Sequence, residues 1–223
     1  MDVTHLVQTA AIYALPLLFA ITLHEAAHGY VARHFGDMTA YAQGRVSLNP
    51  LRHIDVNGTI LVPLALIALS GGKFAFGWAK PVPVNYSALR KPRQHMAWVA
   101  ASGPAVNFAM ALGWALVLKI ALEMQAEPLA RMAIAGIMVN IVVMAINLLP
   151  ILPLDGGRIL AGILPRSLAR EYGKAERWGG YLLLAFIAAS LADAWLADGR
   201  YLGRVFSPLV ELIEAIVRTI ANL

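Results

Sequence analysis

The sequence predicts an all-α polytopic membrane protein with about five to six transmembrane helices, a re-entrant segment and a candidate short membrane-associated β-hairpin. Composition is the first reason, because 59% of the 223 residues are hydrophobic and only 14% are charged. A mean hydropathy of +0.65 is too high for a water-soluble fold that must hide its apolar side chains. The second reason is that segments 96–118 and 132–154 contain no charged residue and are long enough to cross the hydrocarbon core as helices. Soluble enzymes, secreted disulfide scaffolds and nucleic-acid-binding proteins are therefore disfavoured.

Four segments are predicted to span the membrane as helices. They are 6–32, 96–118, 132–154 and 178–197, the last of which is interrupted only by Asp193. Because spans of this length with short joints use the whole chain, we expect a single membrane-embedded domain over residues 1–223, with accessory helices at about 178–222.

Two further apolar segments allow more than one interpretation. Segment 56–72 has a contiguous apolar core of only 60–69, with Pro63 inside it, and fits a re-entrant hairpin better than a full span. Segment 205–220 carries charged residues three and four apart on one helical face (Glu211, Glu214 and Arg218). That pattern suits either an interfacial helix or a span packed against the bundle.

The joints between the segments predict the orientation of a multi-pass protein in the cell membrane. Lys and Arg gather after the first span, before Met96 and after Leu154. The joint 119–131, in contrast, contains equal numbers of basic and acidic residues. Because cytoplasmic joints are enriched in Lys and Arg, the three basic joints are expected in the cytoplasm and the amino terminus outside. The net charge of +5 is then explained by topology and contact with membrane lipids rather than by nucleic acid.

The first predicted span contains the sequence His24-Glu25-Ala26-Ala27-His28. Ionisable groups at membrane depth are costly and usually functional. Histidines four apart lie on one helical face, so both imidazoles can reach one cation while Glu25 stands beside water bound to it. With no cysteine in the chain, a metal site must use His, Asp or Glu. The pattern predicts one Zn²⁺ held by His24 and His28; the alternative is that both rings bond neighbouring carbonyls.

Asp155 is the predicted third zinc ligand. It follows Pro150 and Pro153, which break the helix, and such a break is tolerated at membrane depth only where the backbone is buried or lines a wet cavity. In the predicted topology the first span and the span ending at Asp155 both run inward, so Asp155 reaches the depth of the two histidines. The alternatives are that Asp155 opens a polar loop at the membrane border, or that His53 and Asp55 supply ligands. These last two are more simply expected to cap the re-entrant segment.

Three motifs taken together resemble the core of the site-2 protease family of intramembrane zinc metalloproteases. They are HEAAH in the first span, SGPAVN at 102–107 and NLLPILPLDGGR at 147–158. The resemblance covers a catalytic core of about residues 15–165, and extends more loosely to GRVSLNPLRHID at 44–55 and GWAKPVPVNY at 77–86, which look like segments of small prokaryotic members. We find no room for the PDZ module or the pair of CBS modules carried by other relatives.

The resemblance implies a membrane protease that cuts transmembrane or membrane-proximal segments of protein substrates in regulated intramembrane proteolysis, with its active site toward the cytoplasm. Carried over residue by residue, it makes His24, His28 and Asp155 the zinc ligands. Glu25 would be the catalytic carboxylate, acting as general base on zinc-activated water. Asn147 would help hold substrate near the metal.

Several expectations stay open on sequence grounds. Asn107, beside Pro104, either orients substrate in the cavity or bonds a backbone group that Pro104 frees. Segment 82–84 lies between prolines and is either an edge that pairs with extended substrate or a rigid turn. A zinc-binding membrane transporter and a catalytically silent homologue that binds transmembrane partners are the rival functions. The carboxylate of Glu25 beside the first ligand argues against both rival functions. No motif indicates the substrate or the oligomeric state.

Overall fold

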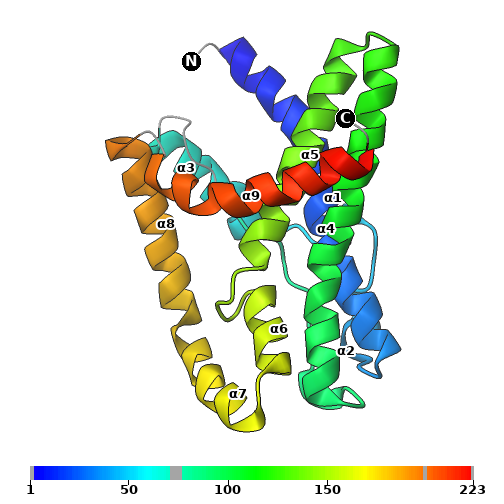
Figure 1. Cartoon of the computed structure of the whole chain (residues 1–223), viewed down its shortest axis with the longest axis vertical. Helices are drawn as coiled ribbons and strands as arrows, with labels where there is room; N and C mark the ends of the chain where they lie inside the picture. Colours follow the sequence, from blue (N-terminus) through cyan, green and yellow to red (C-terminus); the bar gives the residue numbers. More distant parts are fainter. Residues whose placement is uncertain (1–2, 71–76, 198–199, 222–223) are drawn as a thin grey trace.

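The computed structural model describes residues 3–70, 77–197 and 200–221, and its regular structure over these ranges is helical, as predicted (Figure 1). The long helices are α1 (Val3–His34), α4 (Pro92–Glu123), α5 (Glu127–Asn147), α8 (Gly179–Leu196) and α9 (Arg200–Ala221). The shorter helices are α2 (Thr39–Ala42), α3 (Val62–Leu69), α6 (Asp155–Ile163) and α7 (Arg166–Gly173). Single turns are η1 (Pro50–Arg52), η2 (Val56–Leu61), η3 (Tyr86–Ala88) and η4 (Lys174–Trp178). No β-strand occurs in the described ranges, so the candidate hairpin is not found there.

Four helical stretches are long and apolar enough to cross a membrane. They are Ala11–His34, Pro92–Glu123, Glu127–Asn147 and Arg166–Leu196. Each matches one predicted span, and together they make this a multi-pass membrane protein. The two segments with more than one interpretation are not among the four helices of this kind that the described residues contain.

The span predicted at 132–154 is shorter than expected. Helix α5 ends at Asn147, residues 148–154 form an irregular loop, and α6 begins at Asp155. Pro150 and Pro153 have no backbone N–H to continue the helical ladder, which explains the loop. The predicted break before Asp155 is therefore confirmed, and the predicted end of the span is corrected to Asn147.

The segment predicted to be re-entrant is a short helix. Elements η2 and α3 form one apolar helix, Val56–Leu69. At about 1.5 Å per residue, a helix of this length falls short of the roughly 30 Å of hydrocarbon in a bilayer. Asp55 caps its first turn, because Oδ1 of Asp55 accepts the backbone N–H of Gly58 at 2.7 Å. The expected capping role of Asp55 is thus confirmed.

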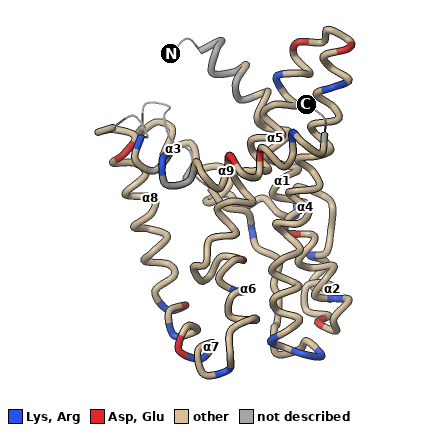
Figure 2. The backbone as a smooth tube through the Cα atoms, viewed as in Figure 1, with Lys and Arg blue, Asp and Glu red and all other residues tan. Residues whose placement is uncertain are grey.

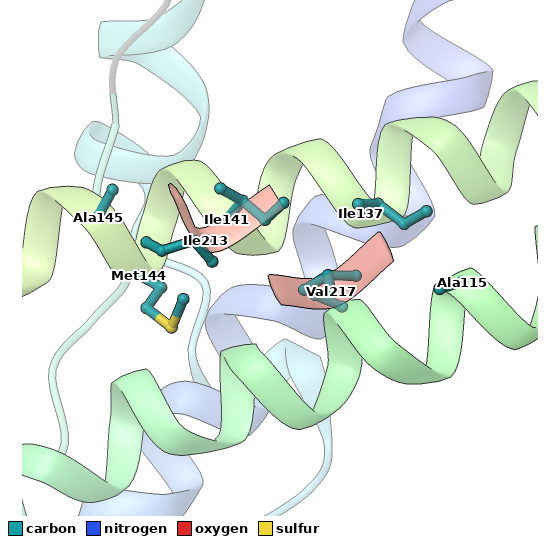
Figure 3. Packing of buried hydrophobic residues seen from close by; sticks show 8 residues of the cluster. Ala115, Ile137, Ile141, Met144, Ala145, Ile213 and Val217 are labelled. Carbon is teal, nitrogen blue, oxygen red and sulfur yellow. The ribbon is translucent and has the colours of Figure 1, made fainter. Parts of the chain in front are cut away.

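A buried apolar cluster holds α9 against α4 and α5 (Figure 3). Its buried members are Ala111 and Ala115 of α4, Ile137, Ile141, Met144 and Ala145 of α5, and Ile213 and Val217 of α9. Small residues at helix interfaces let the backbones approach closely, as expected within a membrane. Helix α9 therefore packs on the bundle, and it runs across the long helices instead of alongside them (Figure 1).

The helix ends sort into two groups along the long axis of the molecule (Figure 1). The end of α1, the start of α4 and the α6–α7 joint lie together at the lower end, whereas the start of α1 and the joint between α4 and α5 lie at the upper end. Lys and Arg mark the lower ends of these elements, and the middle parts of α4, α5 and α8 are almost free of charge (Figure 2). The relative sidedness of the joints around α1, α4 and α6 agrees with the arrangement predicted from loop charge.

We predict that Ile141→Ala destabilises the bundle by about 2–5 kcal/mol, because it empties space at a fully buried position where three helices meet. The measurement is thermal unfolding in detergent. Val142→Ala is the matched control, since the neighbouring Val142 is 39% exposed. Equal losses of stability in the two variants would contradict the packing described here.

Candidate metal centre

His24, His28 and Asp155 meet at one point in the interior. One ligand atom of each residue lies within 4.8 Å of the other two. Nε2 of His24 is 3.1 Å from Oδ2 of Asp155, and Nε2 of His28 is 3.4 Å from Oδ1 of the same carboxylate. The two imidazoles, one turn apart on α1, stand nearly perpendicular with centroids 4.7 Å apart. All three side chains are buried. The predicted ligands from distant parts of the sequence are thus brought together.

The outer nitrogens of both rings are held by helix α4. Nδ1 of His24 lies 2.5 Å from Oδ1 of Asn107, and Nδ1 of His28 lies 2.8 Å from the carbonyl oxygen of Val99. A carbonyl oxygen can only accept, so Nδ1 of His28 must carry the proton. The Asn107 amide is oriented as well, because its Nδ2 donates to the Ala20 carbonyl at 3.2 Å and to Oδ1 of Asn140 at 2.9 Å. Nδ1 of His24 is therefore also a donor.

This hydrogen bonding decides what faces the centre. A neutral imidazole that is protonated on Nδ1 presents an unprotonated Nε2, so two lone pairs and a carboxylate point at one another. Oδ2 of Asp155 is buried and has no hydrogen-bond partner among the described residues, although Nε2 of His24 lies 3.1 Å away. Three acceptors buried together need a cation to balance them. Two imidazoles and one carboxylate fit the donor set that Zn²⁺ takes in catalytic sites.

Asn140 extends this support to α5. It is a polar contact between helices, and it orients the amide that holds His24. Nδ2 of Asn140 donates to the Gly136 carbonyl at 2.8 Å, which leaves its Oδ1 to accept from Asn107. Both asparagines are fully buried. Partners of the second ring nitrogen fix the orientation of metal-binding histidines, and this is the part played by Asn107 and Asn140.

Gly103 makes room for the two imidazoles. A Cβ at this position would lie 2.6 Å from Nε2 of His24 and 2.7 Å from Cε1 of His28, closer than packed atoms allow. Because Gly103 is on α4, this close approach sets how near α4 lies to the histidine face of α1. The SGPAVN motif thus supplies both a gap for the rings, at Gly103, and a partner for one of them, at Asn107.

Glu25 lies next in the chain to His24, and its carboxylate is held by a backbone group outside α1. Its Oε2 accepts the backbone N–H of Val82 at 2.7 Å. Pro81 and Pro83 flank Val82 and have no N–H, so Val82 carries the one backbone donor of this tripeptide. That donor is used by Glu25. These contacts favour the rigid-turn interpretation of 82–84 over a free edge.

Helix α6 presents Asp155 as its first residue, and its packing leaves no room for larger residues after it. A Cβ at Gly157 would lie 2.6 Å from the carbonyl carbon of Ile151, so the loop before α6 folds directly onto the helix start. Arg158 ties the same turn to its surroundings through an ion pair with Glu176 at 3.1 Å and through its guanidinium 4.8 Å from the ring centre of Tyr86. Burial raises the pKa of the Tyr86 hydroxyl, which therefore stays protonated at neutral pH.

The remaining predicted residues lie outside the cluster of three ligands. Asn147 is the last residue of α5, and its Nδ2 donates to the Val143 carbonyl at 3.0 Å. Its role in substrate binding stays a prediction, as does that of Asn107, whose contacts favour the positioning of His24. His53 is buried with Nε2 at 2.8 Å from the Ser47 carbonyl, and neither it nor Asp55 joins the cluster of possible ligands.

The sequence predicts the three residues that form the possible metal site, but not the groups that orient them. The Val99 carbonyl and the Val82 N–H are backbone atoms, which no residue type reveals. Asn140 does carry a signal in the sequence, because an asparagine within an apolar helix must find a polar partner.

Comparison with known proteins gives one consistent result. Residues 117–190 match the family model described as Peptidase family M50. The chain is 37% identical over 186 residues to a Bacillus subtilis protein named "Putative zinc metalloprotease YwhC". The aligned region covers 80% of this chain and 81% of that protein. Two mycobacterial proteins with the same description, both called Rip2, are more distant. The Mycolicibacterium smegmatis protein is 28% identical (81% of this chain, 68% of that one), and the Mycobacterium tuberculosis H37Rv protein is 29% identical (80% and 67%). No solved structure matches the chain.

We predict that Gly103→Ala weakens zinc binding by at least about tenfold, because the added methyl group displaces both imidazoles. Zinc affinity, measured by competition with a chelator, is the readout. Gly113→Ala on the same helix is the matched control, since a Cβ there has nothing within 4 Å. Zinc affinity that is unchanged in Gly103→Ala would mean that the rings lie elsewhere.

We predict that Asn140→Leu weakens zinc binding by about 10–100-fold without removing a ligand, because the Asn107 amide loses the partner that orients it. Asn107→Leu, which removes the partner of His24 itself, is expected to cause at least as large a loss. A matched helical circular dichroism spectrum would show that both variants are folded. Full zinc affinity in Asn107→Leu would contradict the assigned chain of contacts.

Proposed function

The chain belongs to peptidase family M50, the site-2 proteases, and is a zinc metalloprotease with several membrane-length helices; from this membership we propose that it is an intramembrane endopeptidase. It hydrolyses peptide bonds in or near transmembrane segments of other membrane proteins. The observation that carries the proposal is the facing arrangement of His24, His28 and Asp155 beside Glu25, inside helices that are otherwise apolar. The proposed catalytic domain is a single membrane domain over residues 1–223.

His24, His28 and Asp155 hold one zinc ion in this proposal. When bound, zinc acidifies a water molecule and polarises a peptide carbonyl. The three side chains contribute the geometry. Asn107 and the Val99 carbonyl bind the Nδ1 atoms and so leave both Nε2 atoms facing the metal, and the start of α6 holds the carboxylate in place.

Glu25 is the proposed general base. One of its oxygens is held by the Val82 N–H, and the other is assigned to accept the proton of the attacking water and to pass it to the leaving amine. The N–H of Val82 keeps the carboxylate beside the site without neutralising it. Because this contact comes from the backbone, it does not depend on the side chain at position 82.

The substrate must be unwound before it can be cut. A helix keeps its carbonyls in internal hydrogen bonds, so a transmembrane segment has to open locally before a peptide bond can reach the site. Asn147 stands at the start of the loop that leads to Asp155, and we assign its side chain to holding the opened strand. The histidines lie in the last third of α1, toward the end of the molecule where Lys and Arg gather, which supports an active site on the cytoplasmic side (Figure 2).

A zinc transporter is the rival function. Transport needs a succession of sites across the bilayer, and the part of the chain that the structure describes contains one cluster of three possible ligands. A catalytically silent homologue would keep the zinc but have no use for Glu25. A single substitution separates these functions from proteolysis.

We predict that Glu25→Gln abolishes cleavage of a transmembrane substrate while the protein keeps about one zinc per chain, because the amide cannot accept the proton. Zinc is measured by elemental analysis of detergent-purified protein, and cleavage by mass spectrometry after reconstitution with candidate substrates. Asp155→Ala is the companion variant, and it is expected to lose both zinc and cleavage. Undiminished cleavage by Glu25→Gln would remove Glu25 from the mechanism, and zinc retained in full by Asp155→Ala would remove Asp155 from the ligand set.

A further inference from the structure

A second polar site lies at the end of the bundle where α4, α6 and α7 meet, away from the metal ligands. A cavity of about 430 Å³ opens there, and its volume falls within the range of small-ligand sites. It is lined by Lys91, Pro92, Arg93, Gln94, Gly162 and Arg166. Three of these six residues are cationic and none is acidic. We call this cavity the α4–α6–α7 pocket.

The three cations of the pocket are not neutralised by the protein. Ion pairs occupy Arg131, Arg158, Lys174 and Arg218. None of the ion pairs within the described residues includes Lys91, Arg93 or Arg166. Three uncompensated positive charges that line one cavity repel one another, and a bound anion relieves that repulsion.

Arg93 has hydrogen-bonding capacity to spare. Its Nη2 donates to the Ile163 carbonyl at 3.3 Å, at the last residue of α6. Its Nε is buried and has no partner among the described residues. A guanidinium offers five N–H donors in a planar fork that matches two oxygens of a phosphate. A buried N–H donor without an acceptor is destabilising. The pocket supplies no acceptor for Nε of Arg93, and a bound anion would supply one.

Two helix starts add to the positive potential of the pocket. Helix α4 begins at Pro92 and α7 begins at Arg166, and both residues line the cavity. Neither Lys91 nor Pro165, the residues that precede the two helices, caps its helix with its own side chain. Nδ1 of His95 accepts the backbone N–H of Lys91 at 3.2 Å. Uncapped N-terminal N–H groups and the helix dipole favour an anion, and they reinforce the three side-chain charges.

We propose that the α4–α6–α7 pocket binds a phosphate group at the membrane surface, held by Lys91, Arg93 and Arg166. Position favours a lipid headgroup as the source, because α4 is membrane-length and begins at the pocket, so its first turn lies at headgroup depth. Free phosphate has the same chemistry and is the other source. The proposal does not depend on proteolysis.

The pocket is connected to the metal centre by one short helix. Gly162 and Ile163 end the helix that Asp155 begins, and a Cβ at Gly162 would lie 2.6 Å from Cβ of Ala97, so α6 already packs tightly on α4 at this point. A phosphate that bridges Arg93 and Arg166 joins the start of α4 to the start of α7, which follows α6 in the chain. Binding is therefore expected to stabilise the fold around α6 as a whole.

The test compares two triple variants of the full chain. The pocket variant is Lys91→Gln/Arg93→Gln/Arg166→Gln. The control variant, Arg170→Gln/Lys174→Gln/Arg177→Gln, removes three exposed cations that follow the same joint but do not line the pocket. Native mass spectrometry of detergent-purified protein measures binding of phosphatidylglycerol and of phosphatidylcholine. We expect wild type and control to retain phosphatidylglycerol in preference to phosphatidylcholine, and the pocket variant to lose at least about tenfold in apparent affinity for it.

A second arm separates the two sources of phosphate. Wild type in neutral detergent is titrated with inorganic phosphate while the unfolding temperature is followed, with sodium chloride at equal ionic strength as the reference. A rise that the pocket variant lacks assigns the site to free phosphate; a rise with phosphatidylglycerol alone assigns it to lipid. Equal lipid binding by all three proteins, or equal losses in the two triple variants, overturns the proposal. If the pocket variant does not fold, Arg166→Gln alone is measured under the same criteria.

Discussion

The structure depends on one electrostatic constraint: three hydrogen-bond acceptors face one another in an apolar interior. The Nε2 atoms of His24 and His28 and the carboxylate of Asp155 converge there, and both rings carry their proton on the outer nitrogen. Without a cation such a cluster is costly, and with one it is a strong site. Helix α4 holds both rings in this orientation through the Asn107 amide and the Val99 carbonyl.

Helix α4 carries most of that arrangement, although it contributes no predicted ligand. Within three turns it provides the Val99 carbonyl to one ring, the gap at Gly103 to both rings, and the Asn107 amide to the other ring. The same helix packs on α5 and α9 through small residues farther along. Loss of packing along α4 is therefore expected to weaken metal binding, because the groups that hold the two rings move with the helix backbone.

The sequence was sufficient to predict which three side chains form the possible metal site, because metal binding needs particular residue types at particular spacings. Two histidines four apart with Glu25 between them, and an aspartate after a proline-broken helix, allow few other interpretations in a membrane segment. The four long spans followed from apolar length alone. The end of the third span at Asn147 was missed, because the apolar run continues past it through a loop that is buried in part and hydropathy does not distinguish loop from helix.

What the sequence by itself determined is which side chains can bind a metal and which segments must lie in a membrane, since both follow from the composition and period of the chain. The tertiary structure decided how the metal ligands are oriented. Asn107 and Asn140 meet only when α1, α4 and α5 pack together, and Val82 reaches Glu25 only after a long connection has returned to α1. Backbone donors and contacts between helices depend on where the segments lie in space, and no local pattern of residue types encodes that position.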